Sequence, residues 1–438
     1  MRWLIRLAKA AGILLIAVLV LILATVAISN TRWFREKIRT TAESQAARFL
    51  NGTLSLGAIE GNLLTGSVLK NVRLFQDGQE VVAVDEVRLS YKSWELVRSD
   101  LLFRDLTLTR PRIRLIHDGT RWRIGQLLRL PERRQPGGRA LRMPGMTVRQ
   151  GTITIERADN GGALRWPARV TGLDADLSLT IAAGVTDLDI DRAIFQAEEP
   201  ALAVSTLSGR WTTGQGRHYV QGLHLRTSRS ALDGSFSYLP AAQPGERGSM
   251  ASNFSLSPFD FEEFSGLIPG LQRRPLVVSG AVSASGPMDR LRVDTTLADP
   301  SAGNVRANLL VNNSGPTRMF RGKVFTQRLD LALPFANRGL ASRLTVDADI
   351  DLALTDGGFA FERLSGTAQV RSTASRIWGY EWQSASSQVG FRRGVLAVNG
   401  RARAYGADAT TRGTIAPTAR PVRYQLAEIG RASCRERV

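Results

Sequence analysis

The sequence predicts a mainly β protein, in which an N-terminal transmembrane helix precedes an elongated, curled, antiparallel-rich sheet with a U-shaped section and an apolar groove. Three observations predict this architecture. A long uncharged apolar run opens the chain, apolar residues then recur at every second position, and glycines recur inside the alternating stretches. A period of two is typical of a strand with one apolar and one polar face, so we expect strands to dominate from residue 53 onward.

The opening run covers residues 10–31 and follows a short basic segment, 1–9. About 22 residues at ~1.5 Å rise per residue form a helix of roughly 33 Å, which crosses a hydrocarbon core. The side chains expected to anchor the chain in lipid are Leu14, Leu15, Val18, Leu19, Leu21 and Ile22. A cleavable signal peptide is the alternative, but its apolar region normally has only about 7–15 residues. We therefore expect a retained single-pass anchor.

The next segment, 32–52, is expected to be a short amphipathic helix. Its apolar residues recur at spacings of three or four, and Asn51-Gly52 supplies a stop signal. Basic residues flank the anchor on both sides, so charge alone does not set its orientation. The β body that follows favours a cytoplasmic segment 1–9 and a body outside the cytoplasm.

Alternation divides the body into segments. We expect a first β region at 53–128, an Arg-, Pro- and Gly-rich loop at 129–146, and a continuing β region at 147–427. Within the latter, 257–270 opens with Ser-Pro, carries early acidic residues and spaces its apolar residues by three, which predicts a short helix. Residues 428–438 abandon the alternation, and we expect them to be a tail foreign to the native chain.

Strands with one apolar face either close on a second sheet or leave an open trough. The unit apolar-x-Gly-x-apolar recurs, for example at Val278-Gly280-Val282 and Leu364-Gly366-Ala368, and glycine inside a strand permits bending. We therefore expect a coiling sheet with an apolar groove. The groove-lining candidates are Val87, Leu89, Leu106, Leu108, Leu177, Leu179, Leu223, Leu225, Val346, Ile350 and Leu352.

The search for catalytic or metal-binding motifs yields none. The only three His residues have no ligand spacing, and the single Cys, Cys434, excludes a disulfide framework. Asp187-x-Asp189-x-Asp191 and Asp347-x-Asp349-x-Asp351 could line up carboxylates for calcium, but a solvated strand face is the favoured interpretation. We therefore expect no enzyme activity, no metal and no cofactor.

The formal net charge of +19 raises the question of a nucleic-acid partner. No basic stripe interleaved with aromatic residues and no recognisable binding module occurs, so we expect no nucleic acid. Nearly all the basic residues are Arg, which is also a common coding bias, and a basic surface without a dedicated partner is the favoured interpretation. The second interpretation is that the basic surface contacts anionic lipid.

Two stretches resemble a known family. The first covers Leu54 to Leu115 and contains Gly-x-Leu-x-x-Gly, Asn-Val-x-Leu, an Asp-Gly turn and a strand with a central Pro from Leu108 to Leu115. The second covers Leu256 to Val293 and contains the short predicted helix followed by a Gly-containing strand. Together with the anchor, they resemble the AsmA-like family and, within it, the TamB group, the inner-membrane subunit of the translocation and assembly module.

The resemblance implies a single-pass inner-membrane protein whose body lies in the periplasm and carries phospholipid acyl chains toward the outer membrane. It also implies a possible partner, the outer-membrane barrel TamA, although the domain that meets TamA in the family has no counterpart in this sequence. It transfers no catalytic motif. The alternatives are a scaffold or chaperone for outer-membrane protein and autotransporter insertion, whose sheet edge pairs with client strands, and a secreted β-solenoid.

Overall fold

The structure is a computed structural model that describes residues 36, 39–40, 43–44, 51–61, 66–90, 101–102, 105–117, 123, 141–157, 164–182, 184–243, 246–272, 274–355, 361–419 and 423–430. Strands dominate these residues, as the alternation predicted. The chain divides into two compact units. Unit 1 comprises residues 1–162 and 166–201, and unit 2 comprises 163–165 and 202–438.

Unit 1 is a mixed sheet. Its strands are β1 (Thr53–Ser55), β2 (Ala58–Glu60), β3 (Gly66–Gln76), β4 (Gln79–Ser90), β5 (Leu101–Leu102), β6 (Asp105–Thr109), β7 (Arg112–His117), β8 (Leu141–Arg157), β9 (Arg169–Ala182) and β10 (Val185–Glu198). Strands β1 and β2 both pair with β3, and the β3–β4 hairpin turns at Asp77-Gly78. Both turn residues have positive φ, which suits the right-handed twist of a hairpin.

The middle of unit 1 departs from antiparallel order. Strands β6 and β7 pair antiparallel with β4 on one side and parallel with β8 on the other. They are separated by Arg110-Pro111, because proline has no N–H to donate to a ladder. Strands β8, β9 and β10 then continue antiparallel.

Strand β8 corrects the expected loop at 129–146, because residues 141–146 belong to the strand. Pro144 and Gly145 argued against a strand in the sequence. The structure accommodates them at a shift of register between Met143 and Met146, where the β9 pairing skips the Pro144-Gly145 step. A bulge of this kind tolerates a proline inside a sheet. The remaining residues of the expected loop, 129–140, lie outside the described ranges.

Unit 2 is an antiparallel meander. Its strands are β11 (Leu202–Gly214), β12 (Arg217–Thr227), β13 (Ala231–Leu239), β14 (Ser249–Asp260), β15 (Val277–Pro287), β16 (Arg290–Asp299), β17 (Gly303–Asn312), β18 (Arg318–Leu329), β19 (Ser342–Leu354), β20 (Leu364–Ile377), β21 (Tyr380–Arg392), β22 (Val395–Ala404), β23 (Ala407–Ala416) and β24 (Arg423–Gly430).

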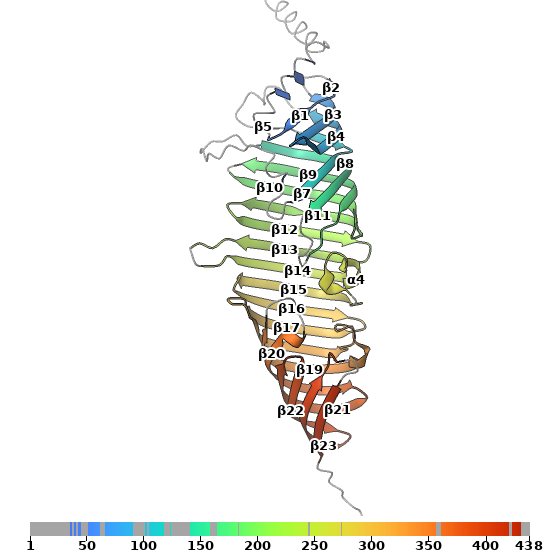
Figure 1. Cartoon of the computed structure of the whole chain (residues 1–438), viewed down its shortest axis with the longest axis vertical. Helices are drawn as coiled ribbons and strands as arrows, with labels where there is room; N and C mark the ends of the chain where they lie inside the picture. The colour runs from blue at the N-terminus through green and yellow to red at the C-terminus, as the bar shows by residue number, and fades with distance from the viewer. Residues whose placement is uncertain are drawn as a thin grey trace, which may run out of the picture. The chain divides into compact units, whose positions relative to one another are not determined.

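Each strand of unit 2 pairs antiparallel with the next along the chain, from β11 to β24, so the strands lie side by side in sequence order (Figure 1). Several hairpins turn on two residues that end in glycine, with positive φ at both positions. These turns are Gln215-Gly216, Trp378-Gly379, Arg393-Gly394 and Tyr405-Gly406. Such turns keep neighbouring strands in direct register.

The helix expected at 257–270 is shorter than predicted. Residues 257–260 end β14, and α4 covers only Phe261–Phe264, followed by the 3₁₀ turn η2 (Pro269–Leu271). The cap is Asp260, whose carboxylate accepts hydrogen bonds from the backbone N–H groups of Glu262 and Glu263. Ser257 and Phe259 remain in the strand because Phe259 and Asp260 pair with β15 after a bulge.

The expected tail at 428–438 also begins too early, because residues 428–430 form the end of β24 and pair with β23. Apolar and polar residues do not alternate at 428–430, but hydrogen-bonded pairing of the backbone does not depend on that alternation. The rest of that segment, 431–438, lies outside the described ranges.

The N-terminal predictions fall mostly outside the described ranges. This holds for segment 1–9 and for the expected anchor at 10–31, including Leu14, Leu15, Val18, Leu19, Leu21 and Ile22. Among the residues that the structure describes, none belongs to a helix of the length and apolarity that crossing a membrane requires.

Of the expected helix at 32–52, residues 36, 39, 40, 43 and 44 are helical, whereas 51–52, which are also described, form a bend outside the helix. Arg39 pairs with Glu36 and Glu43 on this helix, and it donates a hydrogen bond of 3.0 Å to the Leu56 carbonyl oxygen. The Glu43 carboxylate accepts from the Leu56 N–H at 2.8 Å. The helix is thereby tied to the first strands of unit 1.

Candidate functional site

The register of unit 1 gathers its groove candidates on one face. Directly paired residues of neighbouring strands project to the same side of a sheet. Val87 pairs with Leu108, and Leu89 pairs with Leu106. Strand β8 then links this face to β9, where Met146 pairs with both Leu106 and Leu177. Leu179 pairs with Leu188 of β10, and Leu177 with Ile190, so all six unit 1 candidates share an apolar face.

In unit 2, the register also gathers the groove candidates on one face, and this face extends over more strands than in unit 1. Rows of paired residues run across the strands. The rows that contain Val346, Ala348 and Ile350, from β13 to β23, and the row that contains Leu352, from β16 to β23, hold apolar, small or hydroxyl side chains and no charge. The Val346 row is Leu225, Leu232, Leu256, Gly280, Leu297, Val305, Thr326, Val346, Ser372, Ala385, Ala402 and Ala409.

The Ile350 row lies four residues further along β19. It is Phe236, Ser252, Ala284, Val293, Leu309, Gly322, Ile350, Ala368, Val389, Val398 and Gly413. Leu223 pairs with Gly234, and this pair begins the Ala348 row, which lies between the Val346 row and the Ile350 row. Leu352 pairs with Phe320 and Gly366 in the next row along β19. We call this surface the apolar face of unit 2.

Glycines in the apolar face allow the sheet to bend. Gly280 and Gly366 have φ of 140° and 128°, which side chains rarely adopt. A Cβ at Gly280 would overlap the carbonyl oxygen of Thr296 on β16, and one at Gly366 would overlap that of Asp351 on β19. The backbones therefore approach each other closely where the sequence places apolar-x-Gly-x-apolar.

The opposite face of unit 2 is polar. Asp349 and Asp351 lie there, 4.0 Å from Lys323 and 2.7 Å from Arg321 of β18 respectively. The solvated-face interpretation of the Asp-x-Asp-x-Asp stretch is thus correct for these two residues. Among the described residues, no group of three or more His, Cys, Asp or Glu side chains could hold a metal ion.

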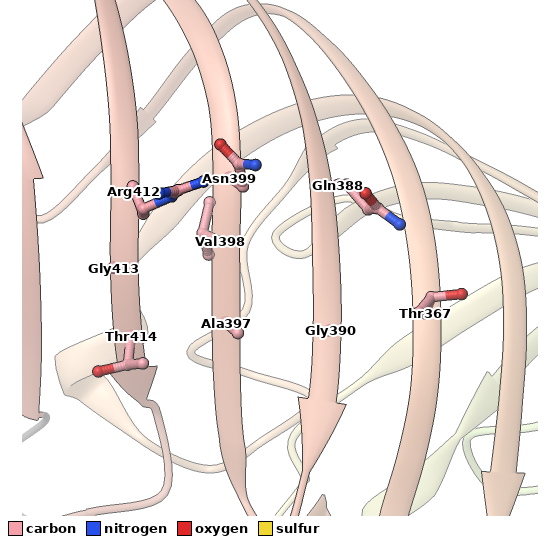
Figure 2. A pocket seen from close by; sticks show the side chains of 9 residues that line it. All are labelled: Thr367, Gln388, Gly390, Ala397, Val398, Asn399, Arg412, Gly413 and Thr414. Atoms are coloured by element: carbon pink, nitrogen blue, oxygen red, sulfur yellow. The ribbon is translucent and has the colours of Figure 1, made fainter.

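A hollow of about 430 Å³ lies over the polar face near the C-terminal strands. Figure 2 shows Gln388, Asn399 and Arg412 on neighbouring strands beside positions where Gly390 and Ala397 have little or no side chain. Register places these residues on the face opposite Val389 and Val398. The hollow brings together no nucleophile with a base, so it offers no acid–base or nucleophilic chemistry.

The two faces differ in burial as well as in chemistry. On β19, Ala348 is buried and Ile350 and Leu352 are half-buried, whereas Asp347 and Asp349 are exposed. Among the described residues, no large side chain is fully buried. Leu276, Val278 and Ala302 form a compact buried cluster, with Leu256, Phe259, Phe261, Leu297 and Leu333 packed against it. A broad apolar surface that no second sheet of described strands covers can bind apolar chains without catalytic groups.

Alternation within single strands located the candidates, but it missed residues that lie on the same face. Leu309, Val324, Val389 and Val398 join it through pairing that only the register reveals. In the sequence, Leu309, Val324 and Val398 alternate with the polar residues Asn308, Lys323 and Asn399, and this alternation could have located them.

Comparison with protein-family models, with curated proteins and with solved structures finds no match to this chain. The fold and the site define it as a mainly β protein with a strand meander that has one apolar and one polar face.

Proposed function

We propose that the apolar faces bind phospholipid acyl chains and that the chain carries phospholipid across the periplasm toward the outer membrane, anchored in the inner membrane by residues 10–31. The observation that carries the proposal is the unbroken set of uncharged rows from β13 to β23. Each methylene group exposed to water costs about 0.8 kcal/mol. A continuous apolar surface lowers this cost at every step of a lipid's path, so transfer needs no catalytic residue.

The resemblance to the AsmA-like family and its TamB group supports the same location and cargo. The TamA barrel would be a partner at the outer membrane. Polar and charged side chains on the opposite face, such as Arg321 paired with Asp351, suit an aqueous compartment.

The test exploits two adjacent leucines of the same strand. Leu309 lies in the Ile350 row, whereas Leu310 lies on the polar face, where 41% of its surface is exposed. Leu309→Asp places a charge in the lipid path, and Leu310→Asp is the matched control. Full-length chain is purified from membranes, and the co-purifying phospholipid is quantified by mass spectrometry.

We expect Leu309→Asp to lower the bound phospholipid several-fold and Leu310→Asp to leave it unchanged. An isolated charge facing acyl chains is strongly unfavourable, whereas a charge on the polar face stays in water. Equal retention by the two variants would contradict the proposal, as would wild-type chain without bound phospholipid.

A further inference from the structure

Basic side chains gather on the polar face of unit 2 over β20 to β23. Directly paired residues of neighbouring strands project to the same side of a sheet. The register places five arginines on this side, which are Arg371, Arg392, Arg401, Arg403 and Arg412. Within β20 to β23, the rows that contain them carry a single carboxylate, Asp408, which pairs with Arg403. All five arginines are exposed, and we call them the arginine patch.

The strands before the patch have a different balance of charge. Over β16 to β19 the polar face carries both signs, namely Arg290, Arg292, Arg306, Arg321 and Lys323 together with Asp294, Asp347, Asp349 and Asp351. Of these, Asp347 borders the patch, opposite Arg371. None of the ion pairs found among the described residues includes an arginine of the patch, whereas Arg321 and Lys323 both have carboxylate partners. The positive charge of the patch is therefore largely unbalanced.

The arginines of the patch lie close enough to share an anion. Arg371 and Arg401 both pair with Ser386, so two strand spacings, roughly 10 Å, separate their backbones. Arg412 pairs with Asn399, two residues before Arg401, and is therefore the diagonal neighbour of Arg401 on the next strand. Like charges at such positions repel each other, and an anion bound between them removes this repulsion.

The hollow of about 430 Å³ opens within the patch, beside Arg412. Its floor has little or no side chain at Gly390 and Ala397, and the amides of Gln388 and Asn399 stand beside it (Figure 2). Guanidinium and amide N–H groups both donate hydrogen bonds, and guanidinium groups bind phosphate oxygens strongly. The hollow therefore combines space for a phosphate group with the donors that would hold it.

The side chains around the patch favour one class of anionic partner. From β20 to β23, the rows of the arginines and of the hollow contain no aromatic residue. Single-stranded nucleic acids stack their bases on aromatic side chains, and protein interfaces depend on buried aromatic or arginine anchors in well-packed pockets. A bilayer with anionic head groups requires neither feature, because its phosphates move laterally and meet each exposed arginine separately.

We propose that the arginine patch docks on a membrane surface that contains anionic phospholipid, and that the hollow beside Arg412 receives a head-group phosphate. The apolar face of the same strands lies on the other side of the sheet, at Val389 and Val398 for example, so docking leaves it free. Delivery of lipid to that membrane rests on the proposed function, whereas the docking itself does not.

The test measures docking on vesicles while the expected anchor occupies a bilayer of its own. Full-length chain is reconstituted in phosphatidylcholine nanodiscs and mixed with vesicles of phosphatidylcholine alone or with added phosphatidylglycerol. Flotation then gives the fraction of chain bound to vesicles. The test variant is Arg401→Gln/Arg412→Gln. The control, Arg292→Gln/Arg306→Gln, removes the same charge from exposed positions on the same face outside the patch.

We expect the wild type to bind the vesicles that contain phosphatidylglycerol and not the others. Arg401→Gln/Arg412→Gln should lower this affinity roughly 25-fold, because each arginine near an anionic surface contributes a factor of about five, and the control should change it little. Ala397→Leu fills the hollow without a change of charge and should lower the affinity several-fold. Its control is Ala281→Leu, at an exposed alanine of the polar face outside the patch.

Three results would overturn the proposal. Equal binding to both kinds of vesicle would exclude an electrostatic dock, and an equal loss in the two double variants would exclude the patch as its location. Binding to polyuridylate or polyglutamate, with none to the phosphatidylglycerol vesicles, would assign the patch to a nucleic acid or an acidic protein instead. Unchanged binding by Ala397→Leu would overturn the phosphate position in the hollow.

Phospholipid that co-purifies with each variant separates the docking from the proposed function. Because Arg401 and Arg412 lie opposite the apolar face, we expect Arg401→Gln/Arg412→Gln to retain as much phospholipid as the wild type. Retained phospholipid without docking by the wild type would overturn the docking and leave lipid binding standing. Docking by a wild type that retains no phospholipid would contradict the proposed function and leave the docking standing.

Discussion

Single glycines decide how closely neighbouring strands approach on the apolar face. Gly280 has φ of 140°, and a Cβ there would overlap the backbone oxygen of Thr296. We expect Gly280→Ala to lower the free energy of unfolding by about 1–3 kcal/mol from backbone strain alone, with more from the overlap. Urea denaturation of the full chain measures it. Gly315→Ala is the control, because a Cβ there meets nothing within 4 Å, and an equal loss in both variants would contradict the role of Gly280.

At the scale of elements, α4 is capped by Asp260 and is joined to a neighbouring turn by a second carboxylate, that of Glu263. Glu263 accepts hydrogen bonds from the hydroxyls of Thr227, Ser228 and Ser230 at 2.7, 2.8 and 2.6 Å. Burial raises the pKa of Glu263, but the hydrogen bonds from Ser230, Thr227 and Ser228 outweigh it, so the pKa lies below its ordinary value. The charged carboxylate therefore fastens α4 to the turn between β12 and β13.

We expect Glu263→Ala to destabilise the chain by about 1–3 kcal/mol near neutral pH, because it removes charge-assisted hydrogen bonds, one of them from the buried hydroxyl of Ser230. Because the folded pKa is depressed, the contribution of Glu263 is complete above its unfolded pKa of about 4.3 and is lost as the pH falls through the folded value. Unfolding measured from pH 7 to pH 3 should show the variant and the wild type converge. Glu262→Ala, an exposed neighbour, should show neither effect.

Elements also show how far the sequence predicts this fold. Alternation predicted the strands and their apolar sides, because a half-buried strand needs that period. It failed where backbone pairing overrides local chemistry, as at Pro144 in β8 and at Ser257 to Asp260 in β14. It could not predict that Phe335, between β18 and β19, meets Phe361, between β19 and β20, because such tertiary contacts leave no periodic signal.

The whole molecule has an apolar face in each unit, and the proposed function gives these faces a common task. If a lipid passes over them in series, one charged residue in either face should stop transfer completely. Leu108→Asp tests unit 1, with Thr107→Asp as its control on the opposite face, where Thr107 pairs with Arg88, and Leu309→Asp tests unit 2. The double variant then shows whether the two effects combine.

We expect each single variant to lower phospholipid transfer to the level of the double variant, because a path in series fails at its first barrier. Transfer by the full chain from labelled donor vesicles to acceptor vesicles measures the rate, and retained phospholipid per chain measures occupancy. Occupancy should behave differently, falling partly in each single variant and further in the double. If the transfer rates of the single variants instead multiply to give the double, each face would exchange lipid independently, and the path in series would be wrong.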